Sequence, residues 1–402
     1  MKEVRGNGQE AQRDQAAELI ARARDMIPVM AERARHCEER RRLPEETDQA
    51  FRAAGFYRIL QPARFGGLEL DYGVQTELAA EIAKGCASSG WNLSVIAAHG
   101  WILGMFPEAA QKTVWATNPD ATISTSFLPR PDAVAERVEG GWRVNGQWGF
   151  SSGADYCQAA IIQAMIQPDA DAPPEAAFLL IPRDQYRIED TWRATALCGT
   201  GSNDLVFERV FVPDEHVLPV RDTRGGGSPG SAVNPHYLYR LPLYATFPFN
   251  LIGAALGAAQ GALDGIVAGL TGRETVTGAN LSRHQSVQLR IAEAAARIDT
   301  AGASLRQVAA QMNARARAGE TIDIEAKLAC RLALAHAARL CIEAVDTLFP
   351  LLGGRGLATG NAVQRAWRDV HAVGQHIGLV WDVQAGIYGR VRLGHPCPDP
   401  KI

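Results

Sequence analysis

The sequence lacks the usual signatures of a disulfide framework, a metal site and a dinucleotide-binding fold. Its seven cysteines are far apart and none forms a CxxC pair, which argues against both disulfides and zinc. No GxGxxG motif follows a predicted strand, and the closest glycine cluster, GGRG at 353–356, comes after a predicted helix. We therefore expect reduced, mostly buried cysteines, no bound metal and no dinucleotide fold.

The chain also lacks an excess of charge of either sign. Its 402 residues carry a formal net charge of −3, which gives no reason to expect nucleic acid or another polyanion as a partner. The polar start, MKEVRGNGQEAQRDQ, has no apolar core of a secretory signal, and no long apolar run free of charge is recognised further on. These patterns favour a cytoplasmic protein that does not enter a membrane.

The first half of the sequence changes from helical to β-type patterns. Residues 1–119 carry helix-period segments such as AAELIARARDMIPVMAERARHCEERRR, interrupted by Pro62 and by the pair Gly66 and Gly67. Residues 120–222 instead hold short β-branched or aromatic runs, including WRVNGQWGF and DLVFERVFVP, bounded by Gly, Pro, Asn and Asp. The patterns predict a helical first domain followed by a small β domain.

The second half begins with a connection and continues with long helices. Residues 223–245 start with the Gly-, Ser- and Pro-rich TRGGGSPGSAVNP, which predicts a flexible connection. Residues 246–402 predict a bundle of about four helices, because a seven-residue apolar repeat is typical of helices packed nearly parallel to their neighbours. One such repeat consists of Ile291, Ile298, Leu305 and Met312.

Six motifs that follow one another along nearly the whole chain resemble those of the acyl-CoA dehydrogenase fold. They are RFGG, NGQWGFSSGADY, GTGSNDLVFERVFVP, ALGAAQGALD, RHQSVQLRIAEAAARID and GGRGLATGNAVQRAWRDVH. The resemblance implies a mainly α fold with an N-terminal helical domain, a β-barrel middle domain and a C-terminal four-helix bundle. It also implies a homotetramer that binds flavin between barrel and bundle.

The dehydrogenases of this fold need a glutamate base that the sequence does not supply. In RDVHAVGQHIG, Ile377 stands where the common glutamate would be, and the helix LIGAALGAAQGALD offers no acid at the alternative position. One branch of the fold, the two-component reduced-flavin-dependent monooxygenases, is more similar. Its members carry a histidine in an AxHxW-type stretch, here His99 with Trp101, a serine like those in FSSG, and a histidine after RD, here His376.

The resemblance to that branch implies an oxygenase component. Such a component accepts FMNH2 or FADH2 from a separate reductase, forms a C4a-hydroperoxyflavin with O2 and hydroxylates an aromatic or other electron-rich substrate. Three alternatives stay open: an acyl-CoA dehydrogenase or oxidase with a displaced base, an N- or S-oxygenase of the same fold, and a non-catalytic scaffold.

For the flavin, the resemblance implies Ser152 as the acceptor for the N5–H group and Arg273 as a partner of the flavin phosphate. Ser151 would face the other way along an extended strand, unless the turn rotates the pair and the two serines exchange roles. Phe150 is assigned to the flavin edge, where an aromatic ring excludes water, although strand aromatics commonly belong to a core. Without the resemblance, the two serines would be interpreted as closing a turn.

For the substrate, His376 is assigned to the reacting face of the flavin, because an imidazole that titrates near neutral pH can take a phenol or amine proton. His99 is assigned to the polar group of the substrate or to the distal peroxide oxygen. Trp101, Tyr237 and Tyr239 are assigned to an aromatic substrate, with the stretch PHYLYRLPLYATFPFN as a lid. A core or surface role is the competing interpretation for each of these side chains.

Other charged side chains near the last motif are given structural roles. Arg365 and Arg368, in QRAWRD, are interpreted as ordinary ion-pair residues with Asp369. His336, within ALAHAARL, is assigned to packing.

Overall fold

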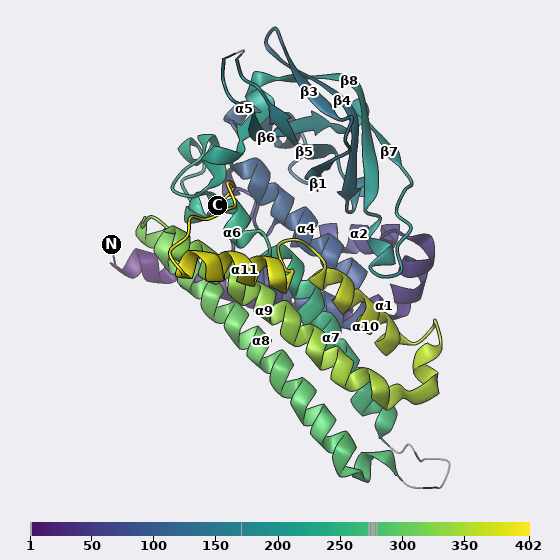
Figure 1. The fold of residues 1–402 in the computed structure, drawn as a ribbon. Coiled ribbons are helices and arrows are strands. Elements are labelled where there is room, and N and C mark those ends of the chain that lie inside the picture. Colours follow the sequence, from purple (N-terminus) through teal and green to yellow (C-terminus); the bar gives the residue numbers. More distant parts are fainter. Residues whose placement is uncertain (1, 170, 272–273, 275–277, 279) are drawn as a thin grey trace.

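The computed structural model describes residues 2–169, 171–271, 274, 278 and 280–402. It is mostly helical, with a β-sheet region that lies at one end of a stack of long helices (Figure 1). Helices form the first part of the chain, strands the middle and helices again the last part. This succession confirms the order of elements that the sequence patterns predict.

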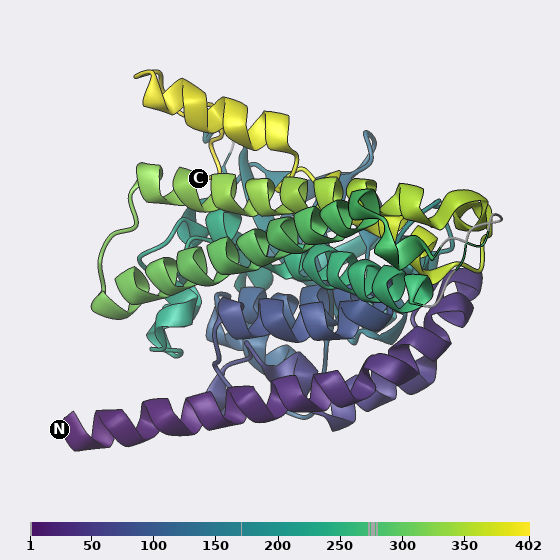
Figure 2. The ribbon, with the colours of Figure 1, turned by 90° about the horizontal axis from the view of Figure 1, so that it is seen from below.

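Five α-helices form the first region: α1 (Lys2–Arg40), α2 (Glu45–Ala53), α3 (Tyr72–Gly85), α4 (Ala87–Gly104) and α5 (Glu108–Trp115). α4 is buried along its whole length, because its sequence contains only apolar and uncharged polar residues. α3 is capped by Asp71, whose side chain accepts a hydrogen bond from the N–H of Val74 at 3.1 Å. α1 runs along the outside of the molecule and curves around the inner helices (Figure 2).

The middle region contains two sheets. Its strands among the described residues are β1 (Ile123–Ser126), β2 (Leu128–Pro129), β3 (Val134–Val138), β4 (Gly141–Ser151), β5 (Ala159–Ile166), β6 (Glu175–Pro182), β7 (Arg187–Glu189), β8 (Asn203–Pro213) and β9 (Val217–Pro219). One sheet has the order β1-β5-β6-β9, with β1 parallel to β5. The other has the order β2-β4-β8-β7, with β3 added to β4.

The two sheets share one hydrophobic core. Trp148 on β4 and Phe207 on β8 meet edge to face, with ring centroids 5.4 Å apart, and Leu179 on β6 belongs to the same cluster. The pairing found among the described strands gives two sheets, so the middle region is a β-sheet region, as the coarser form of the prediction requires.

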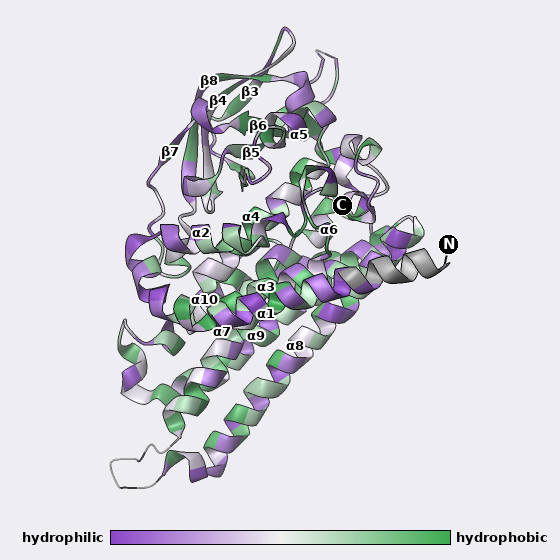
Figure 3. Ribbon diagram, turned by 180° about the vertical axis from the view of Figure 1, so that it is seen from behind, coloured by the Kyte–Doolittle hydropathy of each residue, from purple (hydrophilic) through white to green (hydrophobic). Residues whose placement is uncertain are grey.

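The last region consists of α7 (Phe249–Leu270), α8 (Gln285–Ala318), α9 (Ile324–Leu348), α10 (Ala362–Gly374) and α11 (Trp381–Arg392). The first four pack together, and α11 lies on the outer side of α9. Hydrophilic and hydrophobic residues alternate along α8 (Figure 3). The predicted seven-residue repeat is confirmed there, because Ile298, Leu305 and Met312 are buried.

α7 packs against α3 at very short range. Glycines four residues apart face α3 at Gly253, Gly257 and Gly261. A Cβ atom on Gly257 would lie 2.0 Å from the carbonyl oxygen of Ala80, so this approach of the two helices requires glycine. The contact holds the first region firmly against the last.

By length and composition alone, the segment Leu243–Leu270 is long and apolar enough to span a membrane. Positions 241–263 carry no charged residue, which differs from the expectation that no such run exists. Of the tested window, 61% is buried inside the molecule, and a buried core helix passes the same test. The apolar character of this stretch therefore agrees with the central place of α7 among the helices.

The connection 223–245 is better packed than its composition predicts. Three short helical turns lie in it: Pro229–Ala232, Tyr237–Arg240 and α6 (Leu243–Thr246). The side chain of Leu238 is buried, and the amide of Asn234 donates a hydrogen bond to the carbonyl of Gly104 at 2.7 Å. The second half of the connection thus belongs to the core, because its apolar side chains find a buried place beside α4.

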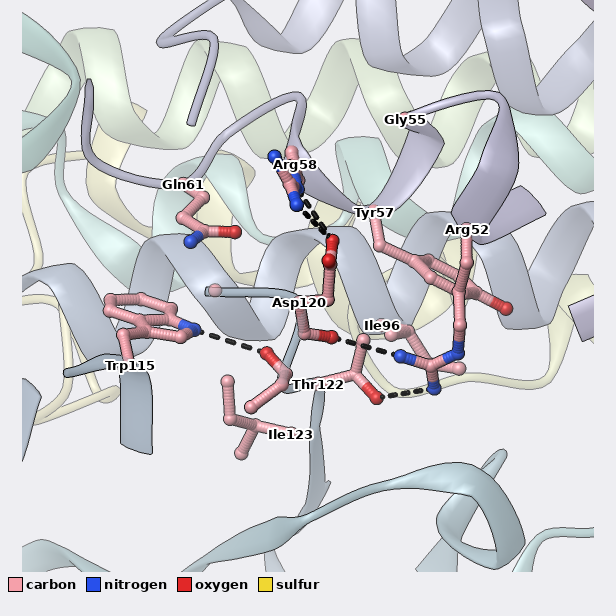
Figure 4. A pocket seen from close by; sticks show the side chains of 12 residues that line it. Arg52, Gly55, Tyr57, Arg58, Gln61, Ile96, Trp115, Asp120, Thr122 and Ile123 are labelled. Carbon is pink, nitrogen blue, oxygen red and sulfur yellow. Dashed lines mark hydrogen bonds and ion pairs between the residues drawn. The ribbon is translucent and has the colours of Figure 1, made fainter. Parts of the chain in front are cut away.

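Arg52, near the end of α2, joins the first region to the β-sheet region. Its guanidinium donates hydrogen bonds to a carboxylate oxygen of Asp48 (2.7 Å), the carbonyl of Asp120 (2.9 Å), the hydroxyl of Thr122 (3.0 Å) and the carbonyl of Tyr156 (2.8 Å). Figure 4 shows two of these contacts around a pocket of about 10 Å³, which has room for a single water molecule. The pocket is therefore part of the joint and too small for an organic ligand.

We predict that Arg52→Met lowers the free energy of unfolding by about 3 kcal/mol, because it leaves the buried Asp48 carboxylate without its cation. Urea denaturation of both proteins measures the difference. The matched change Arg35→Met, in the exposed pair of Arg35 with Glu39, should leave the midpoint nearly unchanged. Equal effects of the two substitutions would show that the Arg52 joint does not stabilise the fold.

Candidate active site

The three regions of the chain meet around the indole of Trp91, near the start of α4. Its Nε1–H donates a hydrogen bond to the hydroxyl of Ser152 at 3.1 Å, just after the end of β4. On another side, the Trp91 ring lies 6.2 Å, centroid to centroid, from the imidazole of His376, which follows α10. The structure thus brings together Ser152 and His376, the two residues on which the predicted chemistry most depends.

A bulge at the end of β4 decides which way the neighbouring side chains point. The register with β8 shifts between Trp148 and Ser151, and Phe150 has a φ angle of +64°. The bulge turns the Phe150 ring outward, where it is 56% exposed, and buries both Ser151 and Ser152. Simple strand alternation therefore does not separate the two serines as expected, since the backbone is not extended at this point.

Ser152 belongs to a cluster of hydroxyl groups. Its Oγ lies 2.7 Å from Oγ of Ser202, which lies 2.7 Å from Oγ1 of Thr200. Thr200 in turn donates to the carbonyl oxygen of Leu197 at 2.9 Å. Ser202 and Thr200 were not among the predicted site residues, although both lie in the motif GTGSNDLVFERVFVP.

His376 is neutral in this environment. Desolvation of the imidazole lowers its pKa to about 4, well below its ordinary value. The N–H of Gly378 donates to Nδ1 at 3.1 Å, so the ring proton of the neutral form is on Nε2. This differs from the expectation that His376 titrates near neutral pH and accepts a proton from the substrate. In the structure without ligands, the neutral ring offers the N–H donor of Nε2.

The next residue, Ile377, is 64% exposed. By the resemblance, this is the position of the base of the acyl-CoA dehydrogenases, and an isoleucine side chain cannot take a proton.

His99 is 2% exposed and uses both of its ring nitrogens. Nδ1 donates to the carbonyl of Ile123 at 2.8 Å, and Nε2 accepts from the hydroxyl of Thr125 at 2.8 Å. Burial lowers the pKa of His99 to about 4, so the ring is neutral. These contacts join α4 to β1, and a contact with substrate would require His99 to give up Thr125.

The residues predicted to bind substrate lie in the packed interior. The indole N–H of Trp101 donates to the carbonyl of Leu238 at 2.8 Å, and the Tyr239 hydroxyl donates to the carbonyl of Leu60 at 3.2 Å. The guanidinium of Arg317 lies over the ring of Tyr237 and also donates to its hydroxyl at 2.9 Å. The structure does not gather these side chains around Trp91, and their substrate roles stay predictions. Arg273 lies outside the described residues.

Asp369, on α10, anchors the turn that carries the hydroxyl cluster. Its carboxylate accepts the N–H of Leu197 at 2.6 Å, and burial raises its pKa to about 6. Arg365 and Arg368 do not form their ion pairs with Asp369 as expected. Both instead pair with Glu38 on α1, at 2.7 and 2.5 Å.

The end of β4 has the surface and polar atoms that a flat, heteroatom-rich ligand requires. Phe150 and Trp192 meet edge to face, with ring centroids 5.9 Å apart, and form an accessible aromatic wall. Oγ of Ser151 and Oδ1 of Asn92 are buried without a hydrogen-bond partner. Because buried polar atoms normally have partners, these two fit a site whose ligand completes the hydrogen bonding. Groups of His, Cys, Asp and Glu that could hold a metal are absent from the described part of the chain.

The family of the chain follows from its similarity to known proteins. Residues 7–118 match the family model "Acyl-CoA dehydrogenase, N-terminal domain" and residues 251–381 match "Acyl-CoA dehydrogenase, C-terminal domain". The sequence is 37% identical to the FADH(2)-dependent resorcinol hydroxylase, oxygenase component, of Rhizobium sp. (strain MTP-10005), over 96% of each chain. The chain belongs to the flavin-dependent monooxygenases of the acyl-CoA dehydrogenase fold.

Solved structures agree with this assignment. The 3-HSA hydroxylase from Rhodococcus sp. RHA1 is similar with a TM-score of 0.90 and 34% identity, covering 96% of this chain and 99% of that one. XiaF from Streptomyces sp., solved in complex with FADH2 and glycerol, has a TM-score of 0.90 and 25% identity, covering 98% and 100%. The predicted family and enzyme class of this monooxygenase are thereby confirmed.

The low pKa of His99 predicts that the monooxygenase loses stability in mild acid. Between about pH 6.5 and 4, the unfolded state binds a proton that the folded state does not, so stability falls as the pH is lowered through this window. The full loss from this group is roughly 3 kcal/mol, because burial lowers the pKa of His99 to about 4. Burial lowers the pKa of His376 and of His236 to about 4 as well, so both add to the loss over the same window. Asp369, whose pKa burial raises to about 6, acts in the opposite direction between about pH 4 and 6.

Urea denaturation at a series of pH values tests this. His99→Gln cannot be protonated, so the slope of unfolding free energy against pH should decrease by up to one proton relative to the parent protein. An unchanged slope would show that His99 does not contribute to the acid sensitivity.

Proposed function

We propose that the chain is the oxygenase component of a two-component hydroxylase that uses FADH2 or FMNH2 from a separate reductase, together with O2, on a phenolic substrate. The resorcinol hydroxylase component at 37% identity and the FADH2 complex of XiaF support the flavin, and the name of the former supports a phenol. The bound reduced flavin would supply the electrons that activate O2.

The observation that carries the proposal is the meeting of Ser152, Trp91 and His376 at one place, beside an accessible Ile377. Ser152 would provide a hydrogen-bonding oxygen for N5 of the flavin. Phe150 and Trp192, whose rings meet edge to face, would cover the flavin ring and exclude water. The arrangement favours oxygen transfer to a substrate over proton removal from an acyl chain, because the base that removal requires is replaced by isoleucine.

His376 would bind the substrate oxygen. Its neutral ring carries the proton on Nε2, so it donates a hydrogen bond to a phenol or phenolate oxygen. Such a donor orients the ring and stabilises negative charge on the substrate oxygen. Electron density from that oxygen activates the neighbouring ring carbon towards electrophilic oxygen.

The finer expectations from the resemblance are part of the same proposal. They comprise a closed middle barrel, a homotetramer, a cytoplasmic location, and contacts of Arg273, Ser151, His99, Trp101, Tyr237 and Tyr239 with the flavin or substrate. Large apolar side chains exposed on the helices of the last region, Val267 on α7 and Leu289 on α8, support burial between subunits. An N- or S-oxygenase remains the second candidate and would convert an amine or sulfide but no phenol.

We predict that His376→Ala binds reduced flavin within about twofold of the parent affinity but hydroxylates a phenol at least 100-fold more slowly. His376→Asn keeps an N–H donor and an acceptor for Gly378 but cannot titrate, so it should recover at least one tenth of the parent rate. Product is measured by chromatography after addition of photoreduced FAD to aerobic buffer.

Three results would contradict the proposal. His376→Asn as inactive as His376→Ala would show that a base, and not a donor, is required. Bleaching of oxidised flavin in the protein by an acyl-CoA would restore the dehydrogenase alternative. Absence of reduced-flavin binding, measured by anaerobic calorimetry, would leave only a scaffold.

A further inference from the structure

A chain of three hydroxyl groups begins at Ser152 and ends on a carbonyl oxygen. The oxygen to oxygen distances are 2.7 Å from Ser152 to Ser202, 2.7 Å from Ser202 to Thr200, and 2.9 Å from Thr200 to the carbonyl of Leu197. All three lie within hydrogen-bonding range. Ser202 and Thr200 are 6% and 1% exposed, so water competes little for their hydrogen bonds.

Only one arrangement of the three hydroxyl hydrogens satisfies all three contacts. The carbonyl of Leu197 can only accept, so Thr200 donates to it. Each hydroxyl has a single hydrogen, and therefore Ser202 donates to Thr200, and Ser152 donates to Ser202. The indole N–H of Trp91 also donates to Ser152. Towards any further group, Ser152 can then act only as an acceptor, with one lone pair left.

The far end of the hydroxyl chain is held firmly. Leu197 has a φ angle of +48°, and its N–H donates to the buried carboxylate of Asp369 at 2.6 Å. Its carbonyl also accepts the indole N–H of Trp192 at 3.1 Å. The acceptor at the end of the chain is thus fixed from two sides, and its position does not depend on a ligand.

We propose that Ser202 and Thr200 are positioning residues that keep Ser152 as an acceptor only, and that this makes the protein prefer reduced over oxidised flavin. The inference rests on the proposed function, in which Ser152 faces N5. Reduced flavin has an N5–H group to donate, whereas oxidised flavin has only a lone pair at N5. A Ser152 that can only accept a hydrogen bond therefore binds the N5–H of reduced flavin and repels the N5 lone pair of oxidised flavin. This preference suits an enzyme that is supplied with reduced flavin.

The test is the ratio of two dissociation constants, for oxidised and for photoreduced FAD, measured by anaerobic titration of the whole protein. Ser202→Ala frees the hydrogen of Ser152 to meet the N5 lone pair, so the ratio should fall about five- to tenfold, the effect of one hydrogen bond. Thr200→Val keeps Ser202 and should lower the ratio about two- to threefold. Ser202→Thr, which restores a hydroxyl, should return it to within about twofold of the parent value.

Thr223→Val is the matched control. The Thr223 hydroxyl is also buried and donates to a carbonyl three residues earlier, Val220, at 2.8 Å, but it lies outside the cluster. It should leave the ratio unchanged. A ratio unaffected by Ser202→Ala in a folded, flavin-binding protein, or equally affected by Thr223→Val, would overturn the positioning role alone. If the parent protein bound no reduced FAD, both the positioning role and the proposed function would be contradicted.

Discussion

The hydrogen bond from Trp91 to Ser152 is the contact on which the rest of the site depends. Trp91 comes from the first helical region, Ser152 from the β-sheet region, and His376, beside the same indole, from the last helical region. The two helical regions share one hydrophobic core and the β-sheet region has a second, and the site lies where the three regions meet. The Arg52 joint and the close approach of α7 to α3 fix the regions relative to one another and so set the geometry at Trp91.

The groups around this contact are polar but mostly uncharged near neutral pH. Desolvation keeps His376 neutral, and the hydroxyls of Ser152, Ser202 and Thr200 carry no charge. Neutral polar groups of this kind can fix which partner donates and which accepts in each hydrogen bond. A charged group would in addition attract water into the site. The arrangement suits chemistry in which an activated oxygen has to be protected from solvent until it meets the substrate.

The sequence predicts the order of helices and strands, the seven-residue repeat of α8, and the importance of Ser152 and His376, because motif order and periodicity are local properties. It does not predict the bulge that turns Phe150 outward. In a regular extended strand, Phe150 would lie on the same side as the buried Trp148, two residues earlier. The partner of Ser152 was also missed, because Ser202 is adjacent only through the pairing of β4 with β8. The low pKa of His376 depends on burial, which no spacing reveals.

The most direct test of the account is an anaerobic crystal structure of the protein with reduced FAD bound. The account predicts N5 within about 2.8–3.2 Å of Oγ of Ser152, with Ser202 still bonded to that oxygen and Nε2 of His376 facing the opposite, open side of the ring. Flavin N5 in contact with Ser151 or a backbone carbonyl, with Ser152 turned away from the ring, would contradict it.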